Sequence, residues 1–188
     1  MDLILLVMIL INFQMDWIDR PEVKKGMIGE KYVQEFLGKK GFIIYKPITE
    51  GSHKIDFFTH HGEQKRVVCV EVKAKRRMAK YQKTGFNYDC YLQYKELWDK
   101  HKIPTYVFFI DDFEECIYGN WLNELGEGWR PPNYNKVIVW DLNRMKFLRK
   151  LNPAEIFEAN QYTKENYDYS NVIKFFSAQQ LIIKYPNA

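Results

Sequence analysis

The sequence lacks the cysteine and histidine patterns that indicate disulfide cross-links or a zinc site. Its 3 cysteines, Cys69, Cys90 and Cys116, show no C-x-x-C spacing and form an odd number, which gives no support for a disulfide framework or a zinc site and fits a reducing, cytoplasmic compartment. The 4 histidines form no H-E-x-x-H or similar pattern. Internal repeats and low-complexity linkers are also missing. With 188 residues, 46% of them hydrophobic, the chain is expected to form one globular domain.

Long apolar runs are scarce as well. The most apolar run, Leu3 to Ile11, has roughly half of the about 20 residues that a membrane-spanning helix needs. A signal peptide would have a positively charged start and a small-residue cleavage site, whereas Asp2 is the only early charge here. No membrane partner is therefore expected. Three interpretations stay open: a packed core element, which we favour, a peripheral or oligomer contact, or a leader upstream of a start at Met15.

Charge is unevenly distributed along the chain. The formal net charge is only +4, but the stretch from Lys65 to Lys83 contains eight Lys or Arg residues against the single Glu71. The stretch from Asp111 to Glu127 is acidic by contrast. A local basic stripe indicates a polyanionic partner such as a nucleic acid. A solvated charged face is the plainer explanation of any charge run taken alone.

Two apolar runs between Lys54 and Lys75 have the pattern of β-strands, and each contains charge where a buried strand should not. Asp56 interrupts the first run, and Glu71 and Lys73 interrupt the second. Side chains alternate between the two faces of a strand, so Glu71 and Lys73 share one face. If the runs pair as a hairpin across Gly62, Asp56 lies beside Glu71. Such a cluster is costly unless something binds it.

The remaining chain predicts an α/β protein. A helix is expected from Pro21 to about Gly38, with Glu30 at the margin of its apolar face. The other expected elements are strand Phe42 to Tyr45, a loop over the site after Lys75, helix Asn87 to Lys102, strand Thr105 to Ile110, helix Tyr118 to Leu125, strand Lys136 to Leu142 and helix Ala154 to Ala159. We expect an apolar extension over residues 1–20, a core over 21–112 and an elaboration of the same domain over 113–188.

The charged cluster suits a hard divalent cation. Mg²⁺ takes oxygen ligands and usually needs one or two carboxylates, which Asp56 and Glu71 supply. Cleavage of a phosphodiester needs a positioned water and neutralisation of the charge that develops on the phosphorus oxygens. Lys73 is placed to do both. Neighbouring cations would lower the pKa of Lys73 and the carboxylates would raise it, and the sequence does not decide between them.

These residues resemble the PD-(D/E)xK nuclease superfamily. The resemblance covers Pro21 to Asp112 and rests on Glu30 in a helix, Asp56 in I-D-F-F, and Glu71-Val72-Lys73 in an apolar strand. It implies an αβββαβ restriction-endonuclease-like core around a mixed sheet. It also implies that Asp56, Glu71 and the main-chain carbonyl of Val72 hold the metal, that Lys73 is the catalytic lysine and that Glu30 assists. Ile55 stands where the family motif has proline.

The prediction that follows is a Mg²⁺-dependent endodeoxyribonuclease, with Mn²⁺ expected to substitute. DNA is the expected partner and RNA a second candidate, and cutting both strands would favour a homodimer with two sites. The residues expected to contact nucleic acid are Lys75, Arg76, Arg77, Lys80, Tyr81 and Lys83. Gln93 and Tyr94 have weaker support as polar groups that face the site. The alternative is an inactive nucleic-acid-binding module of the same fold.

Overall fold

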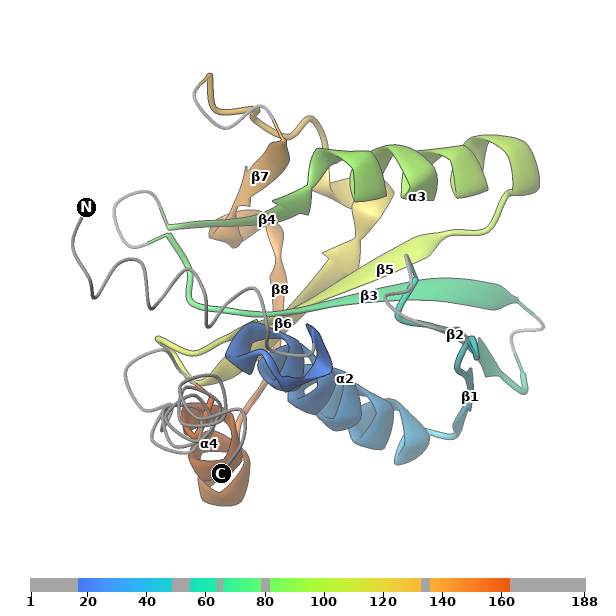
Figure 1. Ribbon diagram of the computed structural model, residues 1–188. Helices are drawn as coiled ribbons and strands as arrows, with labels where there is room; N and C mark the ends of the chain where they lie inside the picture. The colour runs from blue at the N-terminus through green and yellow to red at the C-terminus, as the bar shows by residue number, and fades with distance from the viewer. Residues whose placement is uncertain (1–16, 49–54, 64–65, 79–81, 133–135, 163–188) are drawn as a thin grey trace, which may run out of the picture. The chain divides into compact units, whose positions relative to one another are not determined.

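The computed structural model describes residues 17–48, 55–63, 66–78, 82–132 and 136–162 (Figure 1). The chain divides into two units, one spanning Lys25–Ala159 and one made of Met1–Lys24 and Asn160–Ala188. In the terminal unit, a 3₁₀ turn, Trp17–Asp19, comes shortly before the helix that begins at Pro21, and Lys24 Nζ lies 2.9 Å from Asp19 Oδ1. The apolar run Leu3 to Ile11 lies outside the described residues. No helix in the described part of the chain is long and apolar enough to cross a membrane.

A six-stranded mixed sheet forms the centre of the Lys25–Ala159 unit. Its strand order is β1-β2-β3-β5-β6-β8, and only the β3 and β5 pair is parallel. The strands are β1 (Phe42–Tyr45), β2 (Phe57–His61), β3 (Val67–Ala74), β5 (Thr105–Asp111), β6 (Cys116–Trp121) and β8 (Lys146–Lys150). A second, two-stranded sheet pairs β4 (Lys83–Asn87) with β7 (Val137–Asp141).

The two faces of the large sheet are covered by different elements (Figure 1). Helix α2 (Pro21–Gly38) packs on one face, where its buried Tyr32, Val33 and Leu37 meet the even-numbered valines of β3. Helix α3 (Tyr88–His101) and the β4–β7 sheet cover the other face, in a cluster that includes Cys69 of β3. Short 3₁₀ turns (Leu122–Leu125 and Leu142–Arg144) and helix α4 (Pro153–Asn160) complete the described elements. Strand β3 is therefore sandwiched between two cores.

A glycine sets the distance between α2 and the sheet. A Cβ atom at Gly29 would lie 2.7 Å from Ala74 Cβ and 3.1 Å from Ile110 Cδ1. Because such contacts are too short for carbon atoms, only glycine lets the helix approach β3 and β5 so closely. The charged half of β3 is on the opposite face, because successive side chains of a strand alternate.

The predicted α/β class, the mixed sheet and the order helix, three strands, helix, strand are confirmed, with β4 inserted before α3. Three details differ from the sequence prediction. The segment expected as helix Tyr118 to Leu125 is the end of strand β6 followed by a 3₁₀ turn. Lys83 to Gly85, expected in a loop, belongs to β4, and strand β8 was missed. Pairing with distant strands overrode the weak local pattern in each case.

Candidate active site

Asp56 and Glu71 meet at the β2–β3 hairpin. The two strands pair with Phe57 opposite Val70 and Phe58 opposite Cys69, so one further step along this register sets Asp56 opposite Glu71. A hydrogen bond joins the two segments at this point, since Val72 N–H donates to Asp56 Oδ2 at 2.6 Å. Directly opposed residues of an antiparallel pair share a face. The hairpin predicted from the sequence thus brings the two carboxyl groups together.

Glu71 is a buried carboxylic acid whose negative charge is only partly balanced by its neighbours. The residue is 1% exposed, and its carboxylate forms an ion pair with Lys73 and accepts a hydrogen bond from the Tyr94 hydroxyl. Burial raises the pKa of Glu71 to about 7, because desolvation and the nearby Asp56 charge outweigh the opposing effect of Lys73 and Tyr94. A further positive charge beside Glu71 would favour its ionised form.

Lys73 stays protonated in this environment. Burial alone would lower the pKa of its ammonium, but the charges of Glu71 and Asp56 prevail and raise that pKa above its ordinary value. The ammonium also lies 6.0 Å from the centre of the Phe86 ring on β4. The opposing effects that the sequence left undecided are thus resolved in favour of the carboxylates, which raise the pKa of Lys73.

Lys75 is less exposed than a phosphate-contacting loop residue should be. Its ammonium donates a hydrogen bond to the Gly85 carbonyl of β4. Burial, reinforced by the charge of Lys73, lowers the pKa of Lys75 to about 8. Lys75 follows Glu71 and Lys73 at two-residue spacing and lies one residue past the end of β3, so it extends the row of charged groups beyond the strand.

The loop after Lys75 is anchored by a buried ion pair. The guanidinium of Arg77 pairs with Asp111, which is fully buried at the end of β5, and Arg77 N–H donates to Asp111 Oδ1 at 3.2 Å. Arg77 is thus buried in an ion pair that anchors this loop, whereas the sequence analysis expected it to contact nucleic acid. Arg76 is exposed, 5.1 Å from the Phe113 ring centre, while Lys80 and Tyr81 lie outside the described residues.

Glu30 lies on α2, the helix that packs against the other face of the sheet. Its carboxylate is 3.0 Å from Lys46 Nζ, just beyond β1, and its side chain is only 12% exposed. The position at the margin of the apolar face agrees with the helical spacing. Any part for Glu30 at the metal site remains a prediction.

The oxygen donors around Asp56 suit a small hard cation. Among the described residues, no group of three or more His, Cys, Asp or Glu side chains is placed to hold a metal ion together. Mg²⁺ does not require one, because it keeps several waters and takes only one or two carboxylates. Glu71 is buried with its charge only partly balanced, and a cation shared with Asp56 would balance it. The residues present therefore fit Mg²⁺.

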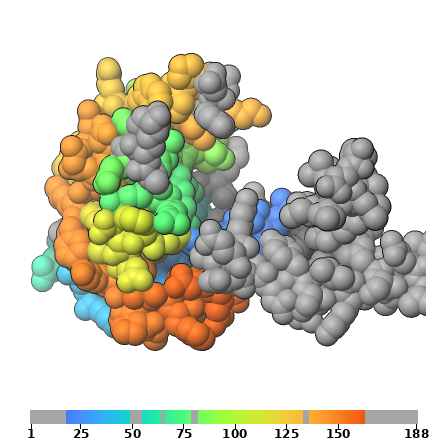
Figure 2. Space-filling model, turned by 90° about the vertical axis from the view of Figure 1, so that its left-hand side faces the viewer, coloured from blue at the N-terminus to red at the C-terminus, as the bar shows by residue number. Residues whose placement is uncertain are grey.

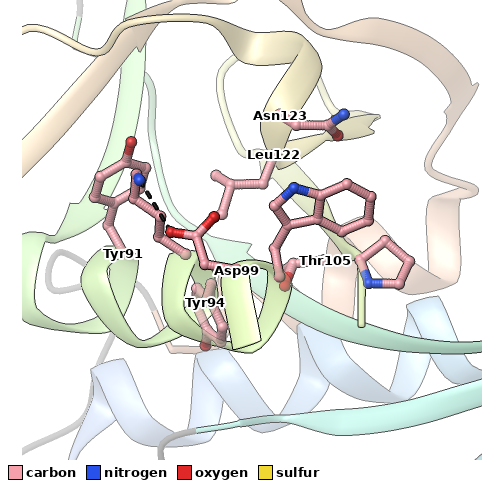
Figure 3. Close-up of a pocket in the computed structure, with 9 residues that line it drawn as sticks. Tyr91, Tyr94, Asp99, Thr105, Leu122 and Asn123 are labelled. Atoms are coloured by element: carbon pink, nitrogen blue, oxygen red, sulfur yellow. Dashed lines mark hydrogen bonds and ion pairs between the residues drawn. The ribbon is translucent and has the colours of Figure 1, made fainter. Parts of the chain in front are cut away.

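A cavity of about 280 Å³ opens on the far side of Tyr94, between α3 and the start of β5 (Figure 3). Tyr91, Trp98, Thr105 and Leu122 also line it. Tyr94 lines this cavity, and its hydroxyl donates a hydrogen bond to Glu71. The helical spacing of α3 indicated an inward Tyr94, but its contact with Glu71 joins distant segments and has no local signal.

Among solved structures, the chain is similar to Archaeoglobus fulgidus Hjc, a Holliday junction resolvase from an archaeal hyperthermophile. The two are 18% identical with a TM-score of 0.47, and the match covers 66% of this chain and 95% of that chain. No family model matches the chain, and no curated protein matches it.

Proposed function

We propose that the chain is a metal-dependent nuclease that hydrolyses phosphodiester bonds in DNA. Asp56 and Glu71 would hold Mg²⁺ together with the main-chain carbonyl of Val72, and Lys73 would position the attacking water. The observation that carries the proposal is the register of β2 and β3. It sets two carboxylates and an ammonium side by side on strands that are otherwise apolar.

The residues would divide the chemistry by charge. When bound, Mg²⁺ supplies a Lewis acid that polarises the phosphate and lowers the pKa of a coordinated water. Lys73 is held protonated by Glu71, so it can donate hydrogen bonds to the water or to a phosphate oxygen and offset the negative charge that develops there. Tyr94 donates to Glu71 and fixes the rotamer of that carboxylate.

Contacts to the DNA backbone are proposed for the basic residues after β3. Arg76 is exposed, and Lys83 is partly exposed on β4. Such cations neutralise phosphates and make binding dependent on salt. Lys75 would act within the site rather than at its rim, because its ammonium is directed at the Gly85 carbonyl.

A cleavage panel tests the proposal. Linear, supercoiled, single-stranded, flap and four-way DNA would be incubated with the protein in Mg²⁺, Mn²⁺ or EDTA. We expect cleavage with either metal and none in EDTA. Asp56→Ala and Lys73→Ala should each lower the rate by roughly 10²-fold or more, the scale measured for single groups that stabilise transition-state charge.

Matched controls are available on α3. Asp99 and Lys95 form an exposed ion pair at 3.1 Å, and Asp99→Ala and Lys95→Ala remove the same two chemical groups outside the cluster. Both should cleave like the wild type. Full activity of Asp56→Ala or Lys73→Ala would refute the assignment. Salt-sensitive DNA binding without cleavage in either metal would instead support an inactive binding module.

A further inference from the structure

The cavity between α3 and the start of β5 has a buried hydroxyl in its wall. Thr105, the first residue of β5, lines the cavity and is only 4% exposed. In the described part of the chain its Oγ1 atom has no hydrogen-bond partner of normal geometry. Cys69 stands opposite Thr105 in the sheet register, and its thiol is only a weak partner for that hydroxyl. Because a buried hydroxyl without a strong partner is unfavourable, a ligand that bonds to Thr105 would remove this cost.

Three separate elements build the walls of the cavity (Figure 3). Helix α3 contributes Tyr91 and Tyr94, the 3₁₀ turn after β6 contributes Leu122 and Asn123, and β5 contributes Thr105. Tyr94 and Leu122 belong to the apolar core cluster on this face of the sheet. The walls are therefore held in place before a ligand arrives, which lowers the entropy cost of binding.

The charges at the cavity balance each other. Lys95 and Asp99 both line it, and Lys95 Nζ lies 3.1 Å from Asp99 Oδ2. The other lining residues are aromatic, aliphatic or uncharged polar. A charged ligand would lose its hydration there without meeting an unpaired opposite charge. The cavity therefore favours an uncharged ligand.

The size and the mixed lining of the cavity indicate a small ring. Its volume of about 280 Å³ is at the lower end of the usual range for ligand pockets, so it suits one or two fused rings. Tyr91, Tyr94 and Trp98 supply aromatic surface. The Thr105 hydroxyl and the Asn123 amide supply hydrogen-bond donors and acceptors. A heteroaromatic ring has an apolar face and a polar edge, and it matches both kinds of surface.

The cavity shares a face of the sheet with the candidate active site but lies toward the other end of the strands. Thr105 pairs with Cys69, two residues before Glu71 on β3. The row of charged groups continues from Glu71 to Lys75, past the end of that strand. Figure 2 shows this far end, where the green surface around β4 borders the yellow surface around the β5–β6 turn. A ligand in the cavity therefore lies next to Tyr94 without occupying the place proposed for the metal.

We propose that this cavity binds an uncharged heteroaromatic ring of about the size of a nucleobase, which hydrogen-bonds to Thr105 Oγ1 and to the Asn123 side chain. The inference goes beyond the proposed nuclease function and does not depend on it. The ring belongs either to a free small molecule or to an unpaired base of a nucleic-acid strand, because both present the same face and edge to the cavity.

Nuclear magnetic resonance of the full chain tests the site, with free adenine, cytosine and thymine as probes. The signal to follow is the indole N–H of Trp98, which lines the cavity. The chain has 5 tryptophans, and loss of one signal in Trp98→Phe identifies it. A ligand of about ten non-hydrogen atoms should bind with a dissociation constant of about 1 mM or below, so at least one base should shift this signal saturably.

Thr105→Val removes the hydroxyl and keeps the shape of the side chain. It should weaken binding of that base by roughly 3-fold to 10-fold, the loss expected for one hydrogen bond between uncharged groups. Thr105→Ser keeps the hydroxyl and should bind like the wild type. The melting temperature of Thr105→Val should not fall, because its hydroxyl has no strong partner to lose.

Thr59→Val is the matched control. Thr59 is also buried, but it lies on the α2 face and its hydroxyl donates to the Ile43 carbonyl at 3.0 Å. It should lower the melting temperature and leave base binding unchanged. The inference is overturned if none of the three bases shifts the Trp98 signal saturably up to about 5 mM. Equal affinity of Thr105→Val and the wild type overturns it as well.

A second titration identifies the source of the ring. A single-stranded oligonucleotide made of the best-binding nucleotide is added in EDTA, which prevents metal-dependent cleavage. A shift of the Trp98 signal that Thr105→Val weakens assigns the cavity to a base within a strand, and a shift with the free base alone assigns it to a small molecule. Cleavage of DNA by a protein that binds none of the bases would refute only the cavity site. Base binding by a protein that cleaves nothing in Mg²⁺ or Mn²⁺ would refute only the nuclease function.

Discussion

The two faces of strand β3 contrast sharply. On the α2 face, Val68, Val70 and Val72 are at most 7% exposed and belong to the apolar core cluster under that helix. On the α3 face, Glu71 is just as buried but holds a carboxylate between Lys73, Tyr94 and Asp56. Alternation along one strand thus separates the residues that stabilise the fold from those that carry charge. Substitutions on the two faces should therefore have separable effects.

The largest effect on stability is expected from the α2 face. Phe108 of β5 is 3% exposed and packs edge-on against Phe36 at a ring distance of 6.4 Å. Phe108→Ala should lower the free energy of unfolding by about 3–5 kcal/mol, through lost burial and the cavity that remains. Urea denaturation measures this loss. The folded fraction should still be stabilised by Mg²⁺, and loss of that metal response would show that the two faces are coupled.

The α3 face should instead respond to pH and metal. The folded-state pKa of Glu71 is about 7, above its ordinary value of 4.5, so the native state retains a proton that the unfolded chain releases. The contribution of Glu71 to stability is therefore complete below about pH 4.5 and is lost as the pH rises through 7. Without metal, the melting temperature of the wild type should fall across this window by more than that of Glu71→Gln.

Adding Mg²⁺ at pH 8 should reverse that loss in the wild type. A ligand that binds only the folded state stabilises it by about 2.7 kcal/mol when present at 100 times its dissociation constant. Glu71→Gln should show little of this gain, because it lacks the second carboxylate. Thermal melts with and without EDTA measure the Mg²⁺ response of each protein. An equal response in the two proteins would contradict the assignment of Glu71 as a ligand.

Local patterns in the sequence were enough to predict the charged face. Strand β1 occupies Phe42–Tyr45 as expected. The alternation of apolar residues in β3, together with the turn at Gly62 between β2 and β3, predicted which residues of the two strands oppose one another. A one-residue slip in that register would have moved Glu71 to the other face, so the buried valines specify it strongly.

The missed features depend on partners far away in the chain. Strand β8, with the sequence K-F-L-R-K, is a charged edge strand whose only sheet neighbour among the described residues is β6. The Arg77 pair with Asp111 joins positions 34 residues apart, and no local pattern distinguishes this arginine from Arg76.

The finest test of the comparison is the single hydroxyl of Tyr94. Tyr94→Phe removes the hydrogen bond to Glu71 but keeps the ring, which packs edge-on against Phe86 at 5.9 Å. Groups that orient a metal ligand typically change metal affinity by about 10-fold to 100-fold. We expect the low end, about tenfold, because Lys73 still holds Glu71. The measurement is the Mg²⁺ concentration that gives half-maximal cleavage.

Tyr91→Phe is the control, since Tyr91 lies about one helical turn before Tyr94 on α3 and its ring stacks on Tyr88. If Tyr94→Phe needs no more Mg²⁺ than Tyr91→Phe does, the hydroxyl serves packing alone, and Lys73 and Asp56 suffice to position Glu71.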